Sequence, residues 1–237
     1  MKYKNAIVTG ASRGLGRAIA RSLAKRGLNL TLASRSETAL ALLAEELSVE
    51  TEVRVETHVC DLRRHEDNRS LIEAALSHYG RIDVLINNAG IGWYKPFMEW
   101  TEQEIVDSID LNLTSPILCT RAVLPSMFEA GRGLIINIGS DLCRRFLPNM
   151  APYVASKFGL LGFSGSVLRE VKDRGVKICT VMPGMIDTNF NESQEGSREE
   201  TWAMKPSVLA EQIASLLDLP EHLIVDEITI HPMQQDF

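Results

Sequence analysis

Hydrophobic residues recur along the chain in two alternating patterns. Short, continuous apolar runs predict buried strands, and segments with apolar residues at helical spacing predict amphipathic helices. The runs that predict strands are residues 6–8, 28–33, 53–59, 82–86, 134–138, 176–181 and 223–230. The segments that predict helices are residues 15–26, 36–47, 65–79, 101–110, 114–130, 152–173 and 206–218.

This alternation predicts the fold class. Apolar strands separated by helices form a parallel sheet that is covered on both faces, and right-handed crossovers wind the sheet in two directions. We therefore predict an α/β, doubly wound, seven-stranded parallel sheet of the Rossmann type. Because no linker or repeat interrupts the pattern, we expect residues 1–237 to form a single domain. The ligand site of such a fold lies at the carboxyl ends of the strands.

The composition narrows the range of partners. The 237 residues are 45% hydrophobic and 24% charged, with a net charge of −6. An acidic balance argues against binding to nucleic acid or anionic membranes. The N-terminus lacks a secretory signal, no apolar run approaches the ~20 residues of a membrane span, and the Cys and His residues show no metal-ligand spacing. We expect a soluble, cytoplasmic protein without a metal or a disulfide framework.

A glycine-rich turn joins the first predicted strand to the first predicted helix. Glycines allow the backbone to approach a pyrophosphate, and the helix N-terminus offers free N–H groups and a positive dipole end. Such a motif alone fits an ordinary strand–helix turn equally well, but its position in an α/β chain favours dinucleotide binding. The residues assigned to the cofactor here are Gly10, Ser12, Arg13, Gly14, Leu15 and Gly16.

The end of the second strand indicates which dinucleotide binds. NAD-dependent proteins usually place an acid there, whereas this chain has Arg35. Arg13 is a second cation directed at the same region. Two guanidinium groups suit a 2′-phosphate, so we predict NADP(H), unless both arginines are merely solvated.

The ends of the third and fourth strands supply the remaining predicted cofactor contacts. Asp61 and Leu62 follow the third strand, where Asp61 either accepts a hydrogen bond from the adenine amine or caps the next helix. The residues assigned after the fourth strand are Asn88, Ala89 and Gly90. These small residues let the cofactor approach and the Asn amides tie strands together, or they form a plain turn.

Tyr153 and Lys157 are the first candidates for catalysis. They stand four residues apart, so they share one face of a predicted helix. An ammonium group and an oxidised nicotinamide would both lower the pKa of a phenol from its ordinary value of about 10. Tyr153 would then donate a proton to a carbonyl oxygen during reduction.

Ser140 and Asn112 complete the candidate site. Ser140 ends the fifth strand, where its hydroxyl either stabilises charge on the substrate oxygen or caps a turn. Asn112 lies between two helical stretches, where it either interrupts the helix and holds a water for proton delivery to Lys157 or is a polar boundary residue.

Together these motifs resemble the classical short-chain dehydrogenases/reductases over the whole chain. The shared features are TGASRGLG at 9–16, NNAG at 87–90, Asn112, Ser140, Tyr153, Lys157 and Pro183-Gly184 through Thr188. The resemblance implies a catalytic tetrad of Asn112, Ser140, Tyr153 and Lys157. It also implies that Ile186 and Thr188 contact the nicotinamide amide or the phosphates, and that residues 187–204 form a mobile substrate lid.

Three features bear on whether the substrate is a 3-oxoacyl group on a carrier protein, and the first two argue against it. Residues 227–237 lack the TGQ…DGG ending that many of these relatives share. Residues 187–200 carry five acids and one arginine, which would attract an acidic carrier protein poorly. Arg144 and Arg145 either attract an anionic substrate or are solvated.

The sequence therefore predicts NADPH-dependent reduction of a small ketone or aldehyde. The alternatives are a 3-oxoacyl thioester reductase and a regulatory protein that binds NADP(H) without turnover. Five aromatic residues either line the substrate pocket or pack in the core or the lid, and the sequence favours neither interpretation. They are Trp93, Tyr94, Phe97, Phe146 and Trp202.

Small residues in one predicted helix bear on the oligomeric state. Gly159, Gly162 and Gly165 lie in helix 152–173, although each interior glycine costs about 1 kcal/mol relative to alanine. Close approach of a second helix would explain them, so we predict a homodimer or homotetramer formed through this helix and helix 114–130. Alternatively, the glycines only accommodate the cofactor and strands of one subunit.

Overall fold

Seven parallel strands form one sheet with the order β3-β2-β1-β4-β5-β6-β7. Their bounds are β1 Asn5–Thr9, β2 Asn29–Ser34, β3 Val55–Val59, β4 Val84–Asn87, β5 Gly133–Ile138, β6 Val176–Pro183 and β7 Glu227–Ile230. The computed structural model describes residues 3–188, 196–197 and 199–235. The strand order reverses between β1 and β4, which is where a doubly wound sheet binds its ligand.

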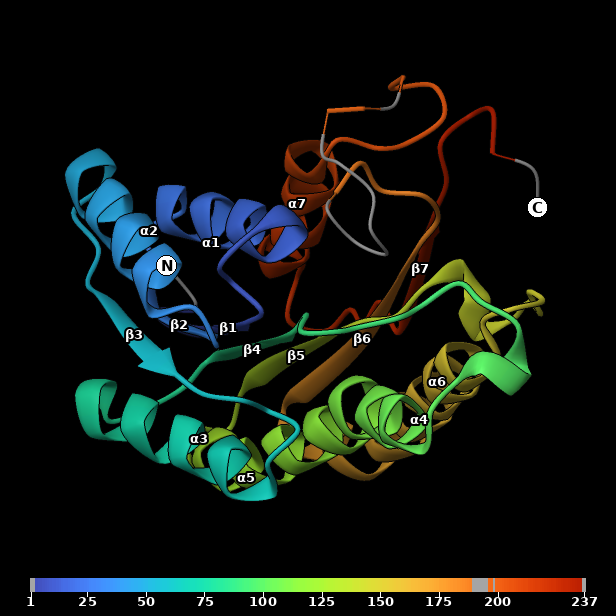
Figure 1. Cartoon of the computed structure of the whole chain (residues 1–237). Helices are drawn as coiled ribbons and strands as arrows, with labels where there is room; N and C mark the ends of the chain where they lie inside the picture. The colour runs from blue at the N-terminus through green and yellow to red at the C-terminus, as the bar shows by residue number, and fades with distance from the viewer. Residues whose placement is uncertain (1–2, 189–195, 198, 236–237) are drawn as a thin grey trace.

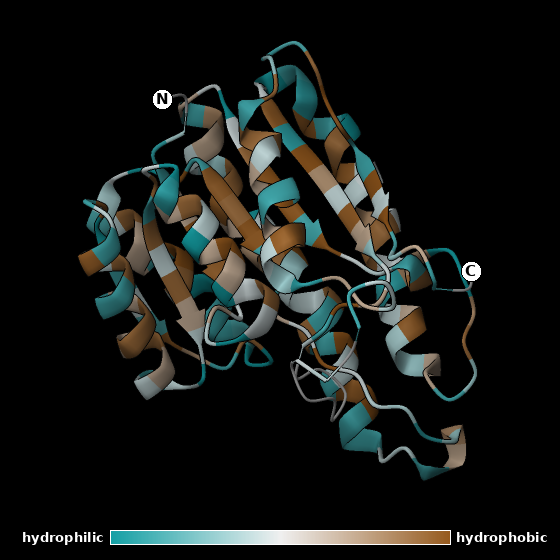
Figure 2. Cartoon of the chain, turned by 90° about the horizontal axis from the view of Figure 1, so that it is seen from above, coloured by the Kyte–Doolittle hydropathy of each residue, from teal (hydrophilic) through white to brown (hydrophobic). Residues whose placement is uncertain are grey.

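Helices cover both faces of the sheet (Figure 1). Their bounds are α1 Gly14–Lys25, α2 Glu37–Glu50, α3 His65–Tyr79, α4 Glu102–Ile109, α5 Ser115–Glu129, α6 Ala151–Val171 and α7 Pro206–Ser215. One face carries α1, α2 and α7, and the other carries α3, α4, α5 and α6. Each face has its own hydrophobic core, one including Leu30 and Ile213 and the other Ile72 and Ile135. Figure 2 shows hydrophobic strands between helices of mixed hydropathy.

Residues at the helix ends explain where several helices begin and stop. The Ser36 hydroxyl accepts a hydrogen bond from the Ala39 N–H at the start of α2. Thr101 and Glu104 form a reciprocal capping box at the start of α4. N-caps of this kind contribute about 1 kcal/mol each. Gly80 ends α3 with a left-handed backbone, at a φ of 69°.

The predicted doubly wound sheet is confirmed, and the differences lie at element ends. The last strand begins at Glu227 instead of residue 223, because Leu223 is 46% exposed and its carbonyl accepts a hydrogen bond from the Lys177 side chain. No loop separates the predicted helices 101–110 and 114–130. A π-helical turn, Asp110–Thr114, joins α4 directly to α5.

Candidate active site

The turn between β1 and α1 has two positions where a side chain would collide with backbone. Gly10 has a φ of 65°, and a Cβ atom on it would lie 2.9 Å from the Cα of Ala89. A Cβ atom on Gly16 would lie 2.2 Å from the carbonyl oxygen of Gly10. The turn therefore packs closely against the segment after β4, as a phosphate-binding turn at the switch point requires.

The N-terminus of α1 is open to an anion. The side chain of its N-cap residue, Arg13, makes no capping hydrogen bond, and the first turn contains no acidic residue. Unpaired N–H groups and the helix dipole at such an end bind phosphate. A Cβ atom on Gly14 would lie 3.3 Å from Thr188, so the predicted phosphate residues and Thr188 are neighbours. Leu15 is buried in the core, which leaves only its backbone for a cofactor.

Thr9 and Asn88 tie the ends of β1 and β4 together. The Asn88 Nδ2 donates to the Thr9 carbonyl at 2.9 Å. The Thr9 Oγ1 accepts from the N–H groups of Asn88 and Ala89 at 2.9 and 3.0 Å. The NNAG segment is thus a strand-tying connection, as one of our two interpretations held. We did not single out Thr9 as a site residue, because its role depends on the neighbouring strand.

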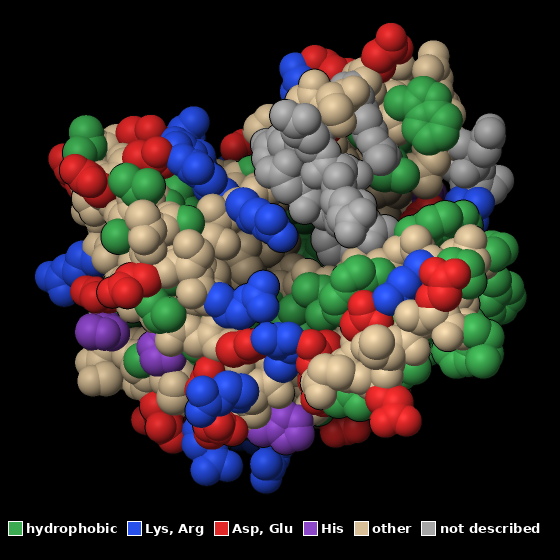
Figure 3. All heavy atoms as spheres, in the orientation of Figure 1, with side chains coloured by type: hydrophobic (Ala, Val, Ile, Leu, Met, Phe, Trp, Pro, Cys, Tyr) green, Lys and Arg blue, Asp and Glu red, His purple; other side chains and the backbone are tan. Residues whose placement is uncertain are grey.

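The two arginines assigned to the 2′-phosphate are exposed, and both lie beyond the carboxyl ends of the strands, where we predict the cofactor. Arg13 precedes α1 and Arg35 follows β2. Neither guanidinium takes part in an ion pair within the part of the chain that the structure describes. Figure 3 shows basic side chains on one side of a hollow in the molecular face and hydrophobic side chains on the other. Both cations therefore remain available to an anionic ligand.

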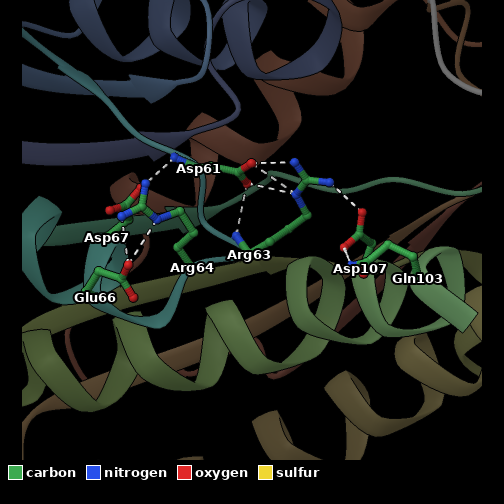
Figure 4. A network of polar contacts seen from close by, with 7 residues as sticks. All are labelled: Asp61, Arg63, Arg64, Glu66, Asp67, Gln103 and Asp107. Atoms are coloured by element: carbon green, nitrogen blue, oxygen red, sulfur yellow. Dashed lines mark hydrogen bonds and ion pairs between the residues drawn. The ribbon is translucent and has the colours of Figure 1, made fainter.

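Asp61 lies after β3 in a network of charged side chains (Figure 4). The Arg63 Nε donates to its two carboxylate oxygens at 2.9 and 3.1 Å. Arg63 also pairs with Asp107 of α4. The hydrogen bonds from Arg63 lower the pKa of Asp61. The Asp61 carboxylate accepts hydrogen bonds from Arg63, which precedes α3, so both interpretations of Asp61 stay open; the neighbouring Leu62 is buried in the core.

Tyr153 and Lys157 lie in the first two turns of α6, and both are buried. The Lys157 Nζ lies 5.5 Å from the centre of the Tyr153 ring. It donates a hydrogen bond to the carbonyl of Ile138, the last residue of β5, at 2.8 Å. Ser140, two residues further along, caps the turn Asp141–Cys143 and also forms a hydrogen bond with Tyr153. The structure thus brings Ser140, Tyr153 and Lys157 together.

The electrostatics of this cluster differ from our expectation. We expected the Lys157 ammonium to lower the pKa of Tyr153, but burial is the largest effect and raises that pKa. The hydrogen bond with Ser140 acts in the opposite direction. Burial also lowers the pKa of Lys157 to about 8. The phenol is therefore protonated at neutral pH, which is the form that a proton donor needs.

Asn112 occupies the π-helical turn and is 1% exposed. Its amide donates to the Ile91 carbonyl at 2.8 Å and to the Ser156 Oγ at 3.2 Å, and its Oδ1 accepts from the Ile91 N–H at 2.9 Å. A Cβ atom on Gly90 would lie 3.1 Å from the Asn112 Oδ1 and 3.9 Å from the Lys157 Nζ. The helix continues through Asn112 as a π-helical turn without a break, and water-mediated proton delivery to Lys157 stays a prediction.

The segment after β6 reaches both the phosphate turn and the predicted lid. Ile186 forms an isolated parallel bridge with Met204. The side chain of Asp187 is buried, and one of its oxygens accepts from the Gly196 N–H at 2.9 Å. Residues 189–195 and 198 of the predicted lid 187–204 lie outside the described residues. The mobility of the lid therefore stays a prediction.

Four of the five aromatic residues considered for a substrate pocket are exposed, namely Tyr94, Phe97, Phe146 and Trp202, and Trp93 is half-buried. Trp93 instead packs edge-on against Trp100, with ring centres 5.6 Å apart. Phe146 stacks on Phe158 of α6 at 5.4 Å. These aromatic side chains are not core residues, so the pocket interpretation stays open for them.

The two arginines between Ser140 and Tyr153 are engaged in ion pairs. Arg144 pairs with Glu227 at the start of β7. Arg145 approaches the carboxylate of Asp141 at 3.4 Å. Our two interpretations, attraction of an anionic substrate or simple solvation, both omitted these partners. Glu227 lies 83 residues from Arg144, so only the fold brings it close, whereas Asp141 lies four residues from Arg145 and could have been found from the sequence.

Two further comparisons with the sequence concern metals and membranes. Among the residues that the structure describes, no group of three or more His, Cys, Asp or Glu side chains is arranged to hold a metal ion. Within the same residues, no helix is both long and apolar enough to cross a membrane. All four cysteines are buried and free.

A glycine-rich turn at the switch point of a doubly wound sheet, with an open helix N-terminus beside it, defines a Rossmann-type dinucleotide-binding protein. The model of the short chain dehydrogenase family matches residues 4–199. The chain belongs to this family, and it is an oxidoreductase.

Similar proteins span nearly the full chain. An uncharacterized oxidoreductase of Staphylococcus saprophyticus is 32% identical over 98% of this chain and 99% of its own. The 3-oxoacyl-[acyl-carrier-protein] reductase FabG of Chlamydia muridarum is 34% identical over 84% of this chain and 80% of its own. The structure of an alcohol dehydrogenase from the archaeon Thermococcus sibiricus, complexed with 5-hydroxy-NADP, superposes with a TM-score of 0.93 at 34% identity and covers 98% of each chain.

Proposed function

We propose that this protein uses NADPH to reduce a ketone or aldehyde carbonyl to an alcohol, in a reaction that is reversible in principle. The observation that carries the proposal is the buried cluster of Ser140, Tyr153 and Lys157 at the edge where the glycine turn lies. A regulatory protein that only binds NADP(H) needs the turn but not this cluster. The cluster therefore favours catalysis.

Each residue of the cluster has a task in the reduction. Tyr153 donates its phenolic proton to the carbonyl oxygen, and Ser140 stabilises the charge that develops on that oxygen. The Lys157 ammonium then stabilises the phenolate that remains. Asn112 holds the backbone at Ile91 in place beside them. The bound cofactor supplies the hydride that the carbonyl carbon receives.

The cofactor preference rests on Arg13 and Arg35. Both cations are exposed at the edge that binds the dinucleotide, and a 2′-phosphate offers them charge-assisted hydrogen bonds. The Thermococcus sibiricus enzyme, which is 34% identical, was solved with 5-hydroxy-NADP. These observations favour NADP(H) over NAD(H).

Exposed aromatic side chains favour an apolar substrate over an acidic carrier protein. Tyr94, Phe146 and Trp202 offer hydrophobic surface, whereas Arg144 and Arg145 are held by acids. Reduction of a 3-oxoacyl thioester is the second candidate, and the likeness to the Chlamydia muridarum reductase supports it. A small ketone or aldehyde fits the described surface better.

The test is a panel of ketones, aldehydes and 3-oxoacyl thioesters with NADPH, followed by the loss of reduced-nicotinamide absorbance. Tyr153→Phe should lower kcat at least about 100-fold, because general acid catalysis is lost. Its affinity for NADPH, measured by fluorescence, should remain close to that of the wild type. Turnover near the wild-type rate in this variant would refute the assigned acid.

A further inference from the structure

The segment that follows β7 returns to the catalytic edge of the sheet. The Gly184 N–H donates to the carbonyl of Ile230 at 2.8 Å. A Cβ atom on Gly184 would lie 2.1 Å from the Gln235 Oε1 and 2.7 Å from the His231 Cδ2. The glycine therefore makes room for residues 231–235, which belong to the ending that sets this sequence apart from many 3-oxoacyl reductases.

One side chain of this segment joins two loops of the candidate site. The Gln235 Oε1 accepts from the Met185 N–H at 2.6 Å. The Gln235 Nε2 donates to the Asp141 Oδ2 at 2.9 Å. Met185 immediately precedes Ile186, which we assign to the cofactor together with Thr188, and Asp141 immediately follows Ser140. A single amide thus spans from the cofactor side of the site to the substrate side.

Asp141 passes this restraint on to Ser140. The Ser140 Oγ donates to the Asp141 Oδ1 at 3.0 Å. The side chain of Asp141 is only 10% exposed, and Arg145 and His231 also approach its Oδ2, at 3.4 and 3.6 Å. A nearly buried carboxylate needs such partners, because burial without them is costly. Asp141 is therefore held firmly, and its orientation sets where the Ser140 hydroxyl lies.

The charge of Asp141 also bears on the reaction. Burial is the main cause of the raised pKa of Tyr153, and the Asp141 charge adds a smaller effect in the same direction, against the phenolate that proton donation leaves behind. A hydrogen bond from a neutral amide disperses this charge without introducing another one. Glutamine at position 235 therefore suits the site better than an acid would.

We propose that Gln235 is a positioning residue for carbonyl reduction, which orients Ser140 through Asp141 and the cofactor loop through Met185. The proposal rests on the proposed function. The Ser140 hydroxyl hydrogen is free to turn from Asp141 to the substrate oxygen, provided that its oxygen is correctly placed. Misplacement of a reacting group by about 1 Å can cost about 100-fold in rate, so a restraint of this kind has a measurable effect.

Two exchanges separate the two arms of Gln235. Gln235→Glu keeps an acceptor for the Met185 N–H but places a carboxylate against Asp141. Gln235→Ala removes both arms. We expect Gln235→Glu to lower kcat about tenfold with unchanged NADPH affinity, and Gln235→Ala to lower both. Met233→Ala is the matched control, because that side chain is 94% exposed, and it should leave both quantities unchanged.

A reciprocal exchange tests whether the contact itself is responsible. In the double variant Asp141→Asn/Gln235→Glu, the Asn amide donates to the Glu carboxylate and its oxygen still accepts from Ser140. We expect each single exchange to lower kcat about tenfold and the double variant to recover to within about threefold of wild type. A merely structural role for either residue would not produce this recovery.

The outcomes are distinct when thermal unfolding shows that all variants fold. An unchanged kcat in Gln235→Glu, or a double variant as slow as the single ones, overturns the positioning role. A wild-type protein that reduces no carbonyl in the panel overturns the proposed function instead. In that case the NADPH affinities of the two variants still test whether Gln235 holds the cofactor loop through Met185. Equal affinities in Gln235→Ala and Gln235→Glu would exclude that role.

Discussion

At the scale of single residues, burial governs the chemistry of the candidate site. It raises the pKa of Tyr153 and lowers that of Lys157, because each charged form is poorly solvated inside the protein. Burial therefore favours the neutral form of both groups. The spacing of four residues alone had led us to expect an ammonium group that lowers the pKa of the phenol. Proton donation by Tyr153 becomes favourable when Lys157 and Ser140 stabilise the phenolate.

Lys157 adds a pH dependence to folding stability that Lys157→Met should remove. Its pKa is about 8 in the folded protein against an ordinary value of 10.5. Between these values the unfolded state binds more protons, so stability relative to the variant rises with pH, by up to about 1.4 kcal/mol per pH unit. Urea unfolding of both proteins from about pH 7 to 10 measures this difference. A difference that stays constant across the range would contradict the assignment.

Arg35→Asp should reverse or abolish the preference for NADPH over NADH. The exchange removes a cation that we assign to the 2′-phosphate and adds an acid of the kind that binds a ribose 2′-hydroxyl. Dissociation constants of both cofactors measure the ratio. Arg54→Asp is the control, because Arg54 is also exposed but precedes β3, at the opposite end of the strands. Equal affinities of the unmodified protein for both cofactors would refute the prediction.

At the scale of elements, irregular backbone places the functional groups. The glycine turn leads from β1 into α1 and leaves the N-terminus of α1 open. The π-helical turn between α4 and α5 carries Asn112 to the loop at Ile91. π-helical turns are rare and frequently occur at functional sites. In both places a local departure from regular structure serves the site.

Gly16→Ala tests the close packing of the glycine turn. An added Cβ would meet the Gly10 carbonyl oxygen at 2.2 Å, so the turn must shift and NADPH affinity should fall at least about tenfold. Gly162→Ala is the matched control, since a Cβ there would meet no other part of the described chain within 4 Å. It should leave NADPH affinity unchanged. Titration of NADPH fluorescence compares the two, and normal affinity in Gly16→Ala would contradict the assigned role.

At the scale of the whole molecule, packing among the described residues does not account for all the small residues on α6. Gly159 is explained, because a Cβ on it would lie 2.8 Å from Leu113. Among the residues that the structure describes, a Cβ atom added to Gly162 would meet nothing within 4 Å outside its own stretch of helix backbone, and one added to Gly165 would meet only the flexible Arg169 side chain. Phe158, on the same helix, is 36% exposed. The within-subunit interpretation thus accounts for only the first of the three glycines.

We therefore expect a homodimer or homotetramer that uses the open face of α6, in an isologous contact about a two-fold axis. Light scattering after size exclusion should give a multiple of the 26.3 kDa chain mass. Gly162→Arg should shift the protein towards the monomer, whereas Met98→Arg, at a 90% exposed residue outside α6, should not. A monomeric wild type at micromolar concentration with cofactor present would show that the interface is absent.

The sequence by itself determined the doubly wound sheet, the glycine-rich turn after β1 and the proximity of Tyr153 and Lys157. These features depend on local periodicity and spacing, which the order of residues records directly. Only the tertiary structure decided the pKa directions and the pairing of Arg144 with Glu227 and of Arg63 with Asp107, because burial and these ion pairs depend on residues brought together by folding. It also decided the place of Gln235, which lies 94 residues from Asp141 along the chain and within hydrogen-bonding distance of it in space. No periodic pattern connects two such positions, so their contact emerges only when β5 and β7, the strands that precede them, lie on either side of β6 in one sheet.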